Sequence, residues 1–415
     1  MSGSRSGDVA DAEPQTGNSG LSRRAFLAGA TALAGAAPIV LRGGEATAAK
    51  YRVGVIGHTR RGDYGHGHDA VWRDVPGCQV VAVADADEKG LAAAVKRLNA
   101  PNGYGDYREM LEKEKPDLVS ICPRWLDQHR DMVVAAAERG VRGVYLEKPL
   151  CRTLAEADEM VAACEKHKTK VAIAHQTRYS PKLPVIRELL RSGEMGQVLE
   201  FRGRGKEDSR GGGEDMWVLG SHVLDLILAL GGEPKWCFAS VSQGGRPITR
   251  DDVKEGAEGI GPLAGDEVHA LYKLASGATA TFDSVRKAGA ELSRFGIQVF
   301  GSKGVLEVTF GTLPAAHFLP DPSWSPGRSG KGWVPVTSAG VGKPEPLKDG
   351  GLHAGNVLAV KDLIAAVEGD RQPECNIGEV RTATEMIVAV FESQRLGAPV
   401  SFPLKNRQNP LTMLP

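Results

Sequence analysis

The sequence predicts an α/β protein in which a doubly wound parallel sheet is followed by a second, α+β domain. Two observations lead to this prediction. Between residues 51 and 174, short apolar segments alternate with helical segments through short connections, which is the pattern of a parallel sheet covered by helices. After residue 198, several β-rich segments are long enough to form one open sheet that is covered by helices on a single face.

Composition narrows the class of protein. The chain has 415 residues, which is enough for two domains after removal of a leader. It contains 51 basic and 51 acidic residues, so no net charge favours nucleic acid or an anionic membrane. None of the six cysteines forms a Cys-x-x-Cys pair, and we therefore predict neither a disulfide framework nor a bound metal.

The elements of the first domain follow from the hydrophobic pattern. Strands are expected at 51–57, 78–84, 117–123, 144–149 and 171–174, and helices near 70 and at 89–98, 107–113, 131–139 and 155–166. Because parallel strands end on one edge of the sheet, the residues that follow these strands are expected to lie together there.

A glycine-rich turn follows the first strand. Gly57, Thr59 and Gly62 match the pattern G-x-G-x-x-G with threonine in the middle position, and this pattern lets a backbone turn approach a pyrophosphate. Arg60 and Arg61 could add positive charge for the phosphates. The turn alone is weak support for a dinucleotide site.

Asp85 strengthens this interpretation, because it ends the second strand. A carboxylate at that position accepts hydrogen bonds from the ribose hydroxyls of adenosine and repels a 2′-phosphate, so we expect NAD rather than NADP. The alternative is that Asp85 caps the helix that follows it.

Glu147, Lys148 and Pro149 end the strand at 144–149, on the same edge as Gly57 and Asp85. A partly buried lysine there can have a lowered pKa or face a developing negative charge, and Glu147 is its expected counter-ion. The alternative is an ordinary surface ion pair, which the position on the sheet edge makes less favourable.

Together these residues resemble the Gfo/Idh/MocA oxidoreductase family. The resemblance rests on the Gly57 turn, Asp85, Cys122-Pro123, Glu147-Lys148-Pro149, Arg178-Tyr179-Ser180-Pro181 and Gly220-Ser221-His222. It implies a Rossmann domain, an open and largely antiparallel second sheet, and hydride transfer between a nicotinamide and a sugar, polyol or related carbonyl. It also implies that Lys148 is catalytic, that Cys122, Pro123, Glu147 and Lys148 contact the cofactor, that Gln176 contacts the nicotinamide ribose, and that Arg178 or Tyr179 contacts the substrate.

The second domain is predicted from its β-rich segments. Strands are expected at 198–205, 235–242, 267–274, 278–285, 295–300 and 305–310, and helices at 182–192, 356–368 and 377–396. Residues 311–350 are rich in Gly, Pro and Ser and indicate a long surface excursion, on which Trp324 and Trp333 could stack on a sugar or anchor the loop. The open face of the sheet predicts a homo-oligomer.

A second chemical centre lies around His222. The family commonly has Asp-x-Gly-x-His, which places a carboxylate one helical turn before the histidine. Val218 occupies that aspartate position here. Either Asp215 supplies the carboxylate or the proton transfer differs from that of simple dehydrogenases. Asp225 could equally pair within its helix, and His222 could be a core or capping histidine.

The amino-terminal segment has the features of a twin-arginine export signal. Arg23 and Arg24 precede an uncharged run from 28 to 41, and Ala46-Thr47-Ala48 forms a small-x-small cleavage site. We expect a signal peptide at 1–48, a periplasmic protein without a stable membrane anchor, and a tightly held NAD. The expected domains are then 49–174 for the cofactor and 175–415 for substrate and oligomer contacts.

Three functions remain open. The leading one is NAD-dependent oxidation of a small carbohydrate, in which Lys148 and His222 handle the hydroxyl proton. The second is glycoside cleavage through transient oxidation, elimination and hydride return, with Tyr179 or a histidine of the His66/His68 turn as base. The third is a nucleotide-bearing binding protein without catalysis.

Overall fold

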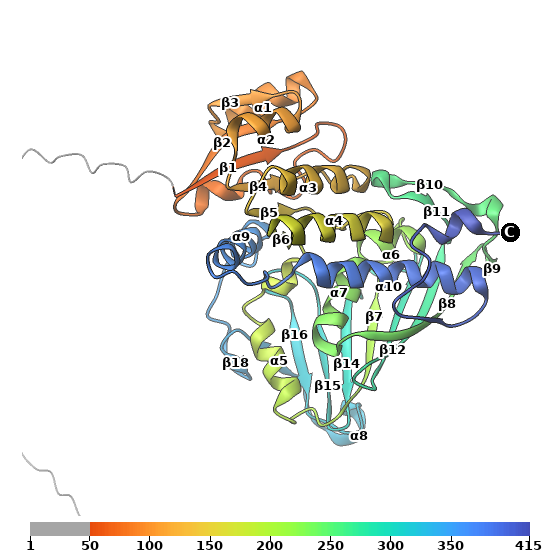
Figure 1. Cartoon of the computed structure of the whole chain (residues 1–415). Helices are drawn as coiled ribbons and strands as arrows, with labels where there is room; N and C mark the ends of the chain where they lie inside the picture. Colours follow the sequence, from red (N-terminus) through yellow and green to blue (C-terminus); the bar gives the residue numbers. More distant parts are fainter. Residues whose placement is uncertain (1–49) are drawn as a thin grey trace, which may run out of the picture. The chain divides into compact units, whose positions relative to one another are not determined.

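A computed structural model describes residues 50–415, so the predicted signal peptide lies outside the described residues. The first sheet has six parallel strands in the order β3-β2-β1-β4-β5-β6 (Figure 1). The strands are β1 (Tyr51–Ile56), β2 (Cys78–Ala84), β3 (Asn102–Tyr104), β4 (Leu118–Ile121), β5 (Gly143–Leu146) and β6 (Lys170–Ile173). The sheet is doubly wound, as predicted, and contains one strand, β3, that was not predicted. Two of the three residues of β3 are exposed, so its sequence lacks the apolar run that indicates a buried strand.

Four α-helices accompany these strands within one residue or two of their predicted bounds: α1 (Glu88–Leu98), α2 (Tyr107–Glu114), α3 (His129–Glu138) and α4 (Leu154–His167). Three of them begin at a side chain that accepts a hydrogen bond from the backbone of the first turn, namely Asp87, Asp106 and Thr153. Asp87 is the N-cap of α1, so the alternative role of Asp85 as the cap is wrong.

The connection between β1 and β2 differs from the prediction. An α-helix was expected near residue 70, but the segment contains turns and a single 3₁₀-helix, η1 (Val71–Asp74). The physical reason is the density of glycines at 57–67, three of which have positive φ. The other 3₁₀-helices of the first half are η2 (Leu126–Gln128) and η3 (Gln176–Tyr179).

The second sheet follows the order β18-β17-β16-β15-β14-β7-β13-β12-β8-β19, with β9 paired to β8. All neighbours with assigned pairings are antiparallel except β13 and β7. The predicted strands are found as β7 (Val198–Arg204), β8 (Pro234–Gln243), β12 (Glu267–Leu274), β13 (Thr279–Val285), β14 (Gly296–Gly301) and β15 (Gly304–Val308). The short strands at the sheet edge are β9 (Arg246–Pro247) and β19 (Val400–Ser401).

Helices cover one face of this sheet, as predicted. Side chains alternate along β12 and β13 between buried and more exposed positions, and the buried set packs with residues of α7 (Gly220–Gly231) and α10 (Ile377–Leu396). The further helices are α5 (Leu183–Arg191), α6 (Gly213–Val218), α8 (Pro326–Ser329) and α9 (Leu352–Glu368). A separate hairpin of β10 (Lys254–Gly256) and β11 (Gly261–Leu263) lies among the short helices η4 (Arg250–Asp252) and η5 (Ala257–Gly259), and η6 (Pro410–Met413) is near the end of the chain.

Residues 311–350 are more ordered than predicted. They extend the second sheet with β16 (Ala316–Leu319), β17 (Val334–Thr337) and β18 (Gly340–Val341). Trp324 anchors this segment, because its indole N–H donates to the Gly301 carbonyl at 2.8 Å and its ring packs on Phe300. Trp333 remains exposed.

The carboxy-terminal helices return to the first sheet. Residues of α9 and the start of α10 belong to the same buried cluster as the strands of the parallel sheet, and Ala172 of β6 forms a bridge with Asn376. The first half therefore includes chain beyond residue 174 in its core. Within residues 50–415, none of the helices has the length and apolar character needed to cross a membrane.

Candidate functional site

The carboxyl ends of β1 and β2, together with η2 in the segment after β4, border a cavity of about 480 Å³. Its lining includes Gly57, Arg61, Asp85, Asp127 and Met132. Because β1 lies between β2 and β4, this is the point where the strand order reverses, and open α/β sheets bind their ligands there. Predicted cofactor residues from two separate segments thus meet at one cavity.

The glycines of the predicted turn are required by close packing. A Cβ atom on Gly57 would lie 2.3 Å from the ring of Tyr64, and a Cβ on Gly62 would lie 2.3 Å from the backbone nitrogen of Arg124. Gly62 also has a φ of +92°, which favours glycine. Gly62, the third glycine of the pattern, therefore packs against the segment that follows β4. This glycine usually permits close packing of a helix, but no α-helix begins at this turn.

Asp85 is buried, and its carboxylate accepts four hydrogen-bonding groups. The Thr59 backbone N–H lies 3.1 Å from both carboxylate oxygens, and the Thr59 hydroxyl donates at 2.7 Å. The Tyr64 hydroxyl donates at 2.9 Å and the Asp87 N–H at 2.9 Å. Burial raises the pKa of Tyr64, and Asp85 raises it further, so this phenol stays protonated as a donor. Asp85 thus fastens the glycine turn as well as lining the cavity.

The two arginines of the turn are already paired. Arg60 forms an ion pair with Asp87, and Arg61 lies 2.5 Å from Asp127 while its guanidinium stacks on Trp125 at 4.7 Å. Only Arg61 lines the cavity.

Glu147 is fully buried at the end of β5, where two histidines of the turn surround it. The His66 backbone N–H donates to its carboxylate at 3.0 Å, and ring nitrogens of His66 and His68 lie at 2.8 Å and 3.4 Å. Burial raises the pKa of Glu147, but His68 and His66 outweigh burial, and the net pKa lies below the ordinary range. Glu147 is thus an ionised anchor for the turn.

Lys148 therefore lacks the counter-ion that the sequence suggested. Its Nζ donates to the backbone carbonyl of Val218 at 3.2 Å, and in the described part of the chain no carboxylate oxygen lies within 4.0 Å of it. The side chain is 7% exposed, and burial lowers its pKa. Lys148 is a buried amine beside the ends of the central strands.

Cys122 and Pro123, which were predicted to contact the cofactor, follow β4 directly. Burial raises the pKa of the Cys122 thiol, which lies 3.8 Å from the Ser120 carbonyl. The Pro123 carbonyl accepts from Nε2 of His129 at 2.7 Å. Neither residue lines the cavity; their backbone packs against Gly62 and Gly65 of the turn.

Gln176 connects the two halves of the chain. Its amide donates to the Asn356 side chain at 2.9 Å and to the Leu352 carbonyl at 3.1 Å. Asn356 also accepts from the Tyr145 hydroxyl at 2.8 Å and donates to the His66 carbonyl at 3.0 Å. The predicted ribose contact is thus part of a network that includes the turn around Glu147.

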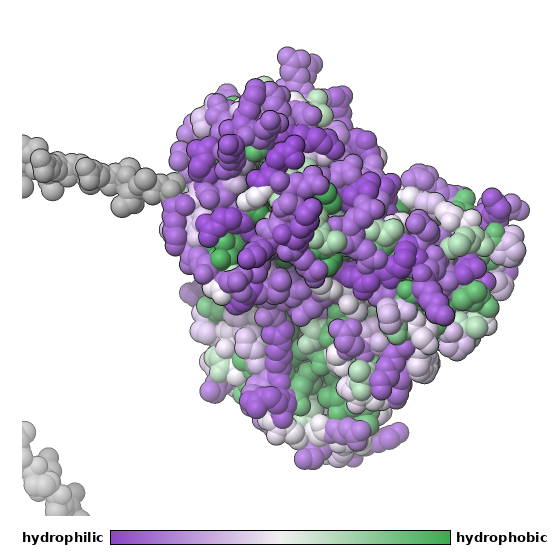
Figure 2. Space-filling model, in the orientation of Figure 1, coloured by the Kyte–Doolittle hydropathy of each residue, from purple (hydrophilic) through white to green (hydrophobic). Residues whose placement is uncertain are grey.

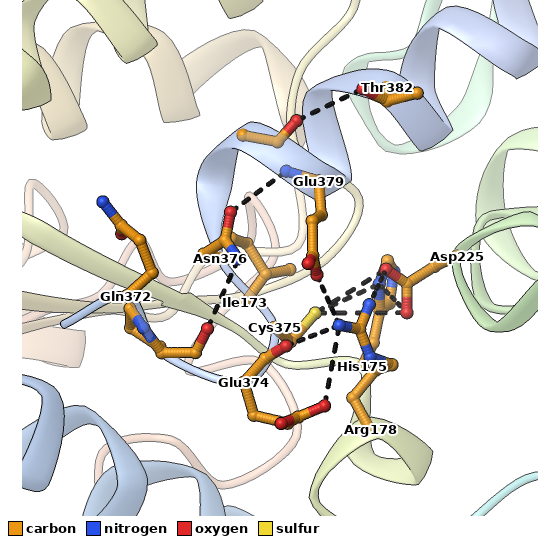
Figure 3. Close-up of polar contacts among 12 residues, drawn as sticks. Ile173, His175, Arg178, Asp225, Gln372, Glu374, Cys375, Asn376, Glu379 and Thr382 are labelled. Atoms are coloured by element: carbon orange, nitrogen blue, oxygen red, sulfur yellow. Dashed lines mark hydrogen bonds and ion pairs between the residues drawn. The ribbon is translucent and has the colours of Figure 1, made fainter. Parts of the chain in front are cut away.

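Arg178 lies in a buried ion cluster, which differs from its predicted contact with substrate (Figure 3). Its guanidinium donates to Asp225 at 2.8 Å and contacts the Glu379 carboxylate and the Glu374 carbonyl. The carboxylates hold the arginine inside, because an unpaired buried charge would be costly. Asp225 pairs across elements and not within its helix, which was one of the two roles that the sequence left open.

Tyr179 also differs from its predicted role as catalytic or substrate-binding group. Its ring belongs to the core of the parallel sheet, and its hydroxyl donates to the carbonyls of Ile173 and Cys375 at 3.2 and 3.3 Å. Burial raises the pKa of Tyr179 well above its ordinary value. This phenol is a structural donor.

His222 begins α7 as predicted, and its ring is half-buried among other rings. The ring centres of His175, Phe310 and Phe295 lie 4.9, 5.9 and 6.3 Å away. Burial lowers the pKa of His222, and nearby His175 and Lys148 lower it further. The imidazole is therefore neutral at pH 7.

Asp215 is fully buried and does not pair with His222. One of its oxygens accepts from the Ser284 hydroxyl at 2.6 Å and from the Glu207 N–H at 3.0 Å. The other oxygen has no hydrogen-bond partner among the described residues. The side chain of Asp215 therefore points toward β13. It does not supply the carboxylate that the family motif has at position 218, where this chain has valine.

The structure gives some residues roles that sequence reasoning did not assign to them. His66 and His68, considered as possible bases, hold Glu147. Asn356 joins Gln176 to this turn, and His175 lies between His222 and Asp225. The only signal for His175 was its place at the end of β6, on the same sheet edge as Lys148.

Two sequence models of one family match the chain. The model described as oxidoreductase family, NAD-binding Rossmann fold, matches residues 51–175, and the GFO/IDH/MocA C-terminal domain matches residues 185–307. Together the matches cover more than half of the chain, and the chain belongs to the Gfo/Idh/MocA family. Its first domain is thus an NAD-binding Rossmann domain.

Named relatives align over part of their length. D-apiose dehydrogenase of Paraburkholderia graminis is 32% identical over 46% of this chain and 53% of its own. Levoglucosan dehydrogenase of Pseudarthrobacter phenanthrenivorans is 25% identical over 54% and 63%. Myo-inositol 2-dehydrogenase of Thermotoga maritima is 24% identical over 61% and 73%. The alignments with the first two span between half and two thirds of these relatives.

Solved structures share the fold over more of the chain. A levoglucosan dehydrogenase in complex with NADH has a TM-score of 0.69 and 20% identity, covering 85% of this chain and 99% of that one. An oxidoreductase from Agrobacterium radiobacter in complex with NAD+, L-tartaric acid and magnesium has a TM-score of 0.64 and 19% identity, covering 85% and 98%. Both likenesses support the α/β architecture with a parallel and a largely antiparallel sheet.

Proposed function

We propose that this protein oxidises a secondary hydroxyl group of a sugar, glycoside or polyol and passes the hydride to NAD. The observation that carries the proposal is Lys148, a buried amine at the end of β5 whose Nζ contacts the Val218 carbonyl instead of a carboxylate. β5 lies two strands from β1, whose carboxyl end borders the cavity, and the amine is near enough to His222 of α7 to lower the pKa of that imidazole.

The residues around the cavity fit a dinucleotide. Gly57 and Arg61 of the turn line the cavity, and Asp85 supplies the carboxylate for a ribose. Arg61 and Arg108 are the arginines on the lining. When bound, nicotinamide supplies the hydride acceptor.

Lys148 and His222 would manage the hydroxyl proton. As the C–H bond gives up its hydride, the O–H proton must leave for the carbonyl to form. Burial lowers the pKa of Lys148, so its neutral form is more accessible than that of an exposed lysine, and a neutral amine can accept that proton. His222 is neutral as well and can hold the hydroxyl oxygen by a hydrogen bond.

The ring environment of His222 favours a carbohydrate. Phe295 and Phe310 pack at 4.4 Å beside the imidazole, and such an apolar surface next to hydrogen-bonding groups suits the C–H face of a sugar ring. The relatives named for D-apiose, levoglucosan and myo-inositol act on polyhydroxylated compounds by name. These names support a dehydrogenase, and the elimination route has no comparable support, since Tyr179 and the His66/His68 turn are engaged in structural contacts.

The test is to incubate the purified protein with a panel of polyols, sugars and glycosides while following nicotinamide absorbance and released sugar. NADH formation with one substrate class is the expected result. Sugar release without net NADH would replace this proposal by the elimination route, and ligand binding with neither signal would favour a binding protein.

We also propose export and self-association. Export rests on Arg23 and Arg24 and is tested by replacing both with lysine, which should keep the protein in the cytoplasm. Self-association rests on the uncovered face of the second sheet, where Phe238 and Leu271 are paired across β8 and β12 and are 46% and 36% exposed. On the face that carries α5, α7 and α10 in Figure 1, Figure 2 shows a further gathering of apolar side chains in this domain.

A further inference from the structure

His222 has an unusual neighbour for a histidine whose family motif normally includes an aspartate. Val218 cannot orient an imidazole, but the His175 ring lies with its centre 4.9 Å from that of His222 and at 55° to it. Two imidazole nitrogens in a hydrogen bond of about 3 Å place their ring centres roughly 5 Å apart. The spacing therefore suits a nitrogen-to-nitrogen hydrogen bond, which a rotation of the His222 ring would complete.

His175 has one nitrogen paired and one nitrogen free for this contact. Its Nδ1 lies 3.3 Å from Asp225, which favours a proton on Nδ1. Its Nε2 is buried and has no hydrogen-bond partner among the described residues. A buried acceptor without a partner is costly, so this atom is the strongest indication that the site holds a further contact.

Asp225 is fixed as a carboxylate on the far side of His175 (Figure 3). Its oxygens face Arg178 at 2.8 Å, and Cys375 contributes a thiol at 3.8 Å. Burial raises the pKa of Asp225, but Arg178 and His175 outweigh burial and the net shift is downward. The negative charge is thus maintained without exposure to solvent.

We propose that His175, held by Asp225, orients His222 and shares its proton, in place of the aspartate that the family motif has at position 218. The chain of groups runs from Asp225 through His175 to His222. This inference rests on the proposed function, and it makes His175 and Asp225 positioning residues for the oxidation. When His222 takes up the substrate proton, that proton binds one nitrogen of its ring, and the N–H on the other ring nitrogen donates to Nε2 of His175. The step transfers a proton only and involves no redox change.

A metal site is the other interpretation of this cluster. His175, Asp225 and Cys375 each offer a ligand atom, all within 4.8 Å of one another. Arg178 argues against a cation here, because its guanidinium already occupies Asp225 at 2.8 Å and would repel the ion. Burial also raises the pKa of the Cys375 thiol, which disfavours the thiolate that a metal would need.

The charged groups near His222 set the expected pH behaviour. His175, Lys148 and His66 disfavour its protonated form, and Glu147 favours it. Asp225 adds a negative charge behind His175, so the substitution Asp225→Asn should move the acid limb of the kcat/KM profile to lower pH. Arg178 retains Glu379 as a partner in that variant.

The first test compares two substitutions of His175 under steady-state conditions. His175→Phe keeps a ring but removes both nitrogens, and kcat should fall by about 10- to 100-fold, less than the ~10²–10⁴ of a direct acid or base. KM for the polyol and NADH affinity should stay within about threefold. His175→Gln keeps an acceptor near Nε2 and should recover part of kcat. Equal losses of kcat in the two variants would overturn the relay.

His269→Gln is the matched control, because His269 also lies between carboxylates, Asp283 at 2.6 Å and Glu267 at 2.8 Å, but on the open face of the second sheet. It should leave kcat and its pH profile unchanged. Treatment with a chelator should also leave kcat unchanged; a loss that zinc restores would overturn the relay in favour of a metal.

A second readout does not need activity. In protein labelled with ¹⁵N-histidine, the His222 ring signals are assigned from the His222→Gln spectrum and titrated in Asp225→Asn and His175→Phe. A downward shift of the His222 pKa in Asp225→Asn is the expected result. If the wild type oxidises no polyol, the proposed function fails, and this titration still decides the relay: an unchanged His222 titration in both variants would refute it.

Discussion

The Nζ of Lys148 donates to the backbone carbonyl of Val218 at 3.2 Å, so a main-chain group at the end of α6 holds the amine in position. A carbonyl orients the amine without neutralising it, and Glu147 is held by His66 and His68 instead. The replacement of an aspartate by valine at position 218 therefore removes a side-chain charge but keeps an acceptor for the lysine.

Lys148→Met should abolish turnover, by about 10²-fold or more, because methionine has similar length but no proton acceptor. Bound NAD should be retained, since Lys148 does not line the cavity at the ends of β1 and β2. The measurement is NADH formation together with the absorbance of nucleotide released on denaturation. Near-normal turnover would contradict the assignment of Lys148.

Tyr179→Phe should leave kcat and KM unchanged. The variant loses donors to two carbonyls and should lower the free energy of unfolding by about 0.5–1.5 kcal/mol. Urea unfolding followed beside initial rates tests this. A large rise in KM with unchanged stability would restore the substrate contact that the sequence suggested.

Asp85→Ser should shift cofactor preference toward NADP, because it removes the charge that repels a 2′-phosphate. It should also loosen the glycine turn, since Thr59 and Tyr64 donate to this carboxylate. The measurement is the ratio of kcat/KM for NAD to kcat/KM for NADP in Asp85→Ser and in the control Tyr64→Phe, which only loosens the turn. This ratio should change in Asp85→Ser alone. An unchanged ratio in Asp85→Ser would count against the ribose contact.

The protein should lose stability as pH falls below about 6.5, the ordinary pKa of histidine. Burial lowers the pKa of His68, so in that window the unfolded chain binds a proton that the folded chain does not. The slope is at most about 1.4 kcal/mol per pH unit for this one group. His68→Gln, which keeps a donor for Glu147, should flatten the slope in urea titrations between pH 7.5 and 5.5; an identical slope would exclude His68 as the source.

Leu271→Glu should shift the protein toward monomers if the open sheet face is the subunit contact. A carboxylate in an apolar interface is costly to desolvate, and Phe238 lies directly across from Leu271. Light scattering of the variant and of the exposed control Leu292→Glu provides the comparison. A wild type that is already monomeric at micromolar concentration would remove the proposal.

Most of the fold could be predicted, because strands such as β2 and helices such as α1 carry strong periodic patterns with caps. The strands of residues 311–350 could not, since β16 and β17 have only four residues each and lie in a segment rich in Gly, Pro and Ser. The 3₁₀ segment after the glycine turn was also missed, because the glycines at 57–67 favour turns over an α-helix.

The site was predictable where a residue ends a strand. Gly57, Asp85 and Lys148 lie on one sheet edge for that reason. Arg178 and Tyr179 were misplaced, because a motif gives the order of residues but not which side of the chain faces the core. Their partners, Glu379 and Cys375, come from a segment some two hundred residues later.

The absence of a helix after the glycine turn has an electrostatic consequence. A helix would offer its positive end to the phosphates, whereas here Arg60 and Arg61 are paired with Asp87 and Asp127 in the segment between β1 and η2. Phosphates that recruit these arginines would release two carboxylates at the rim of the cleft. The loaded protein would then carry more negative charge at the nucleotide end of the site, beside β1, and not at the end of β5 where Lys148 lies.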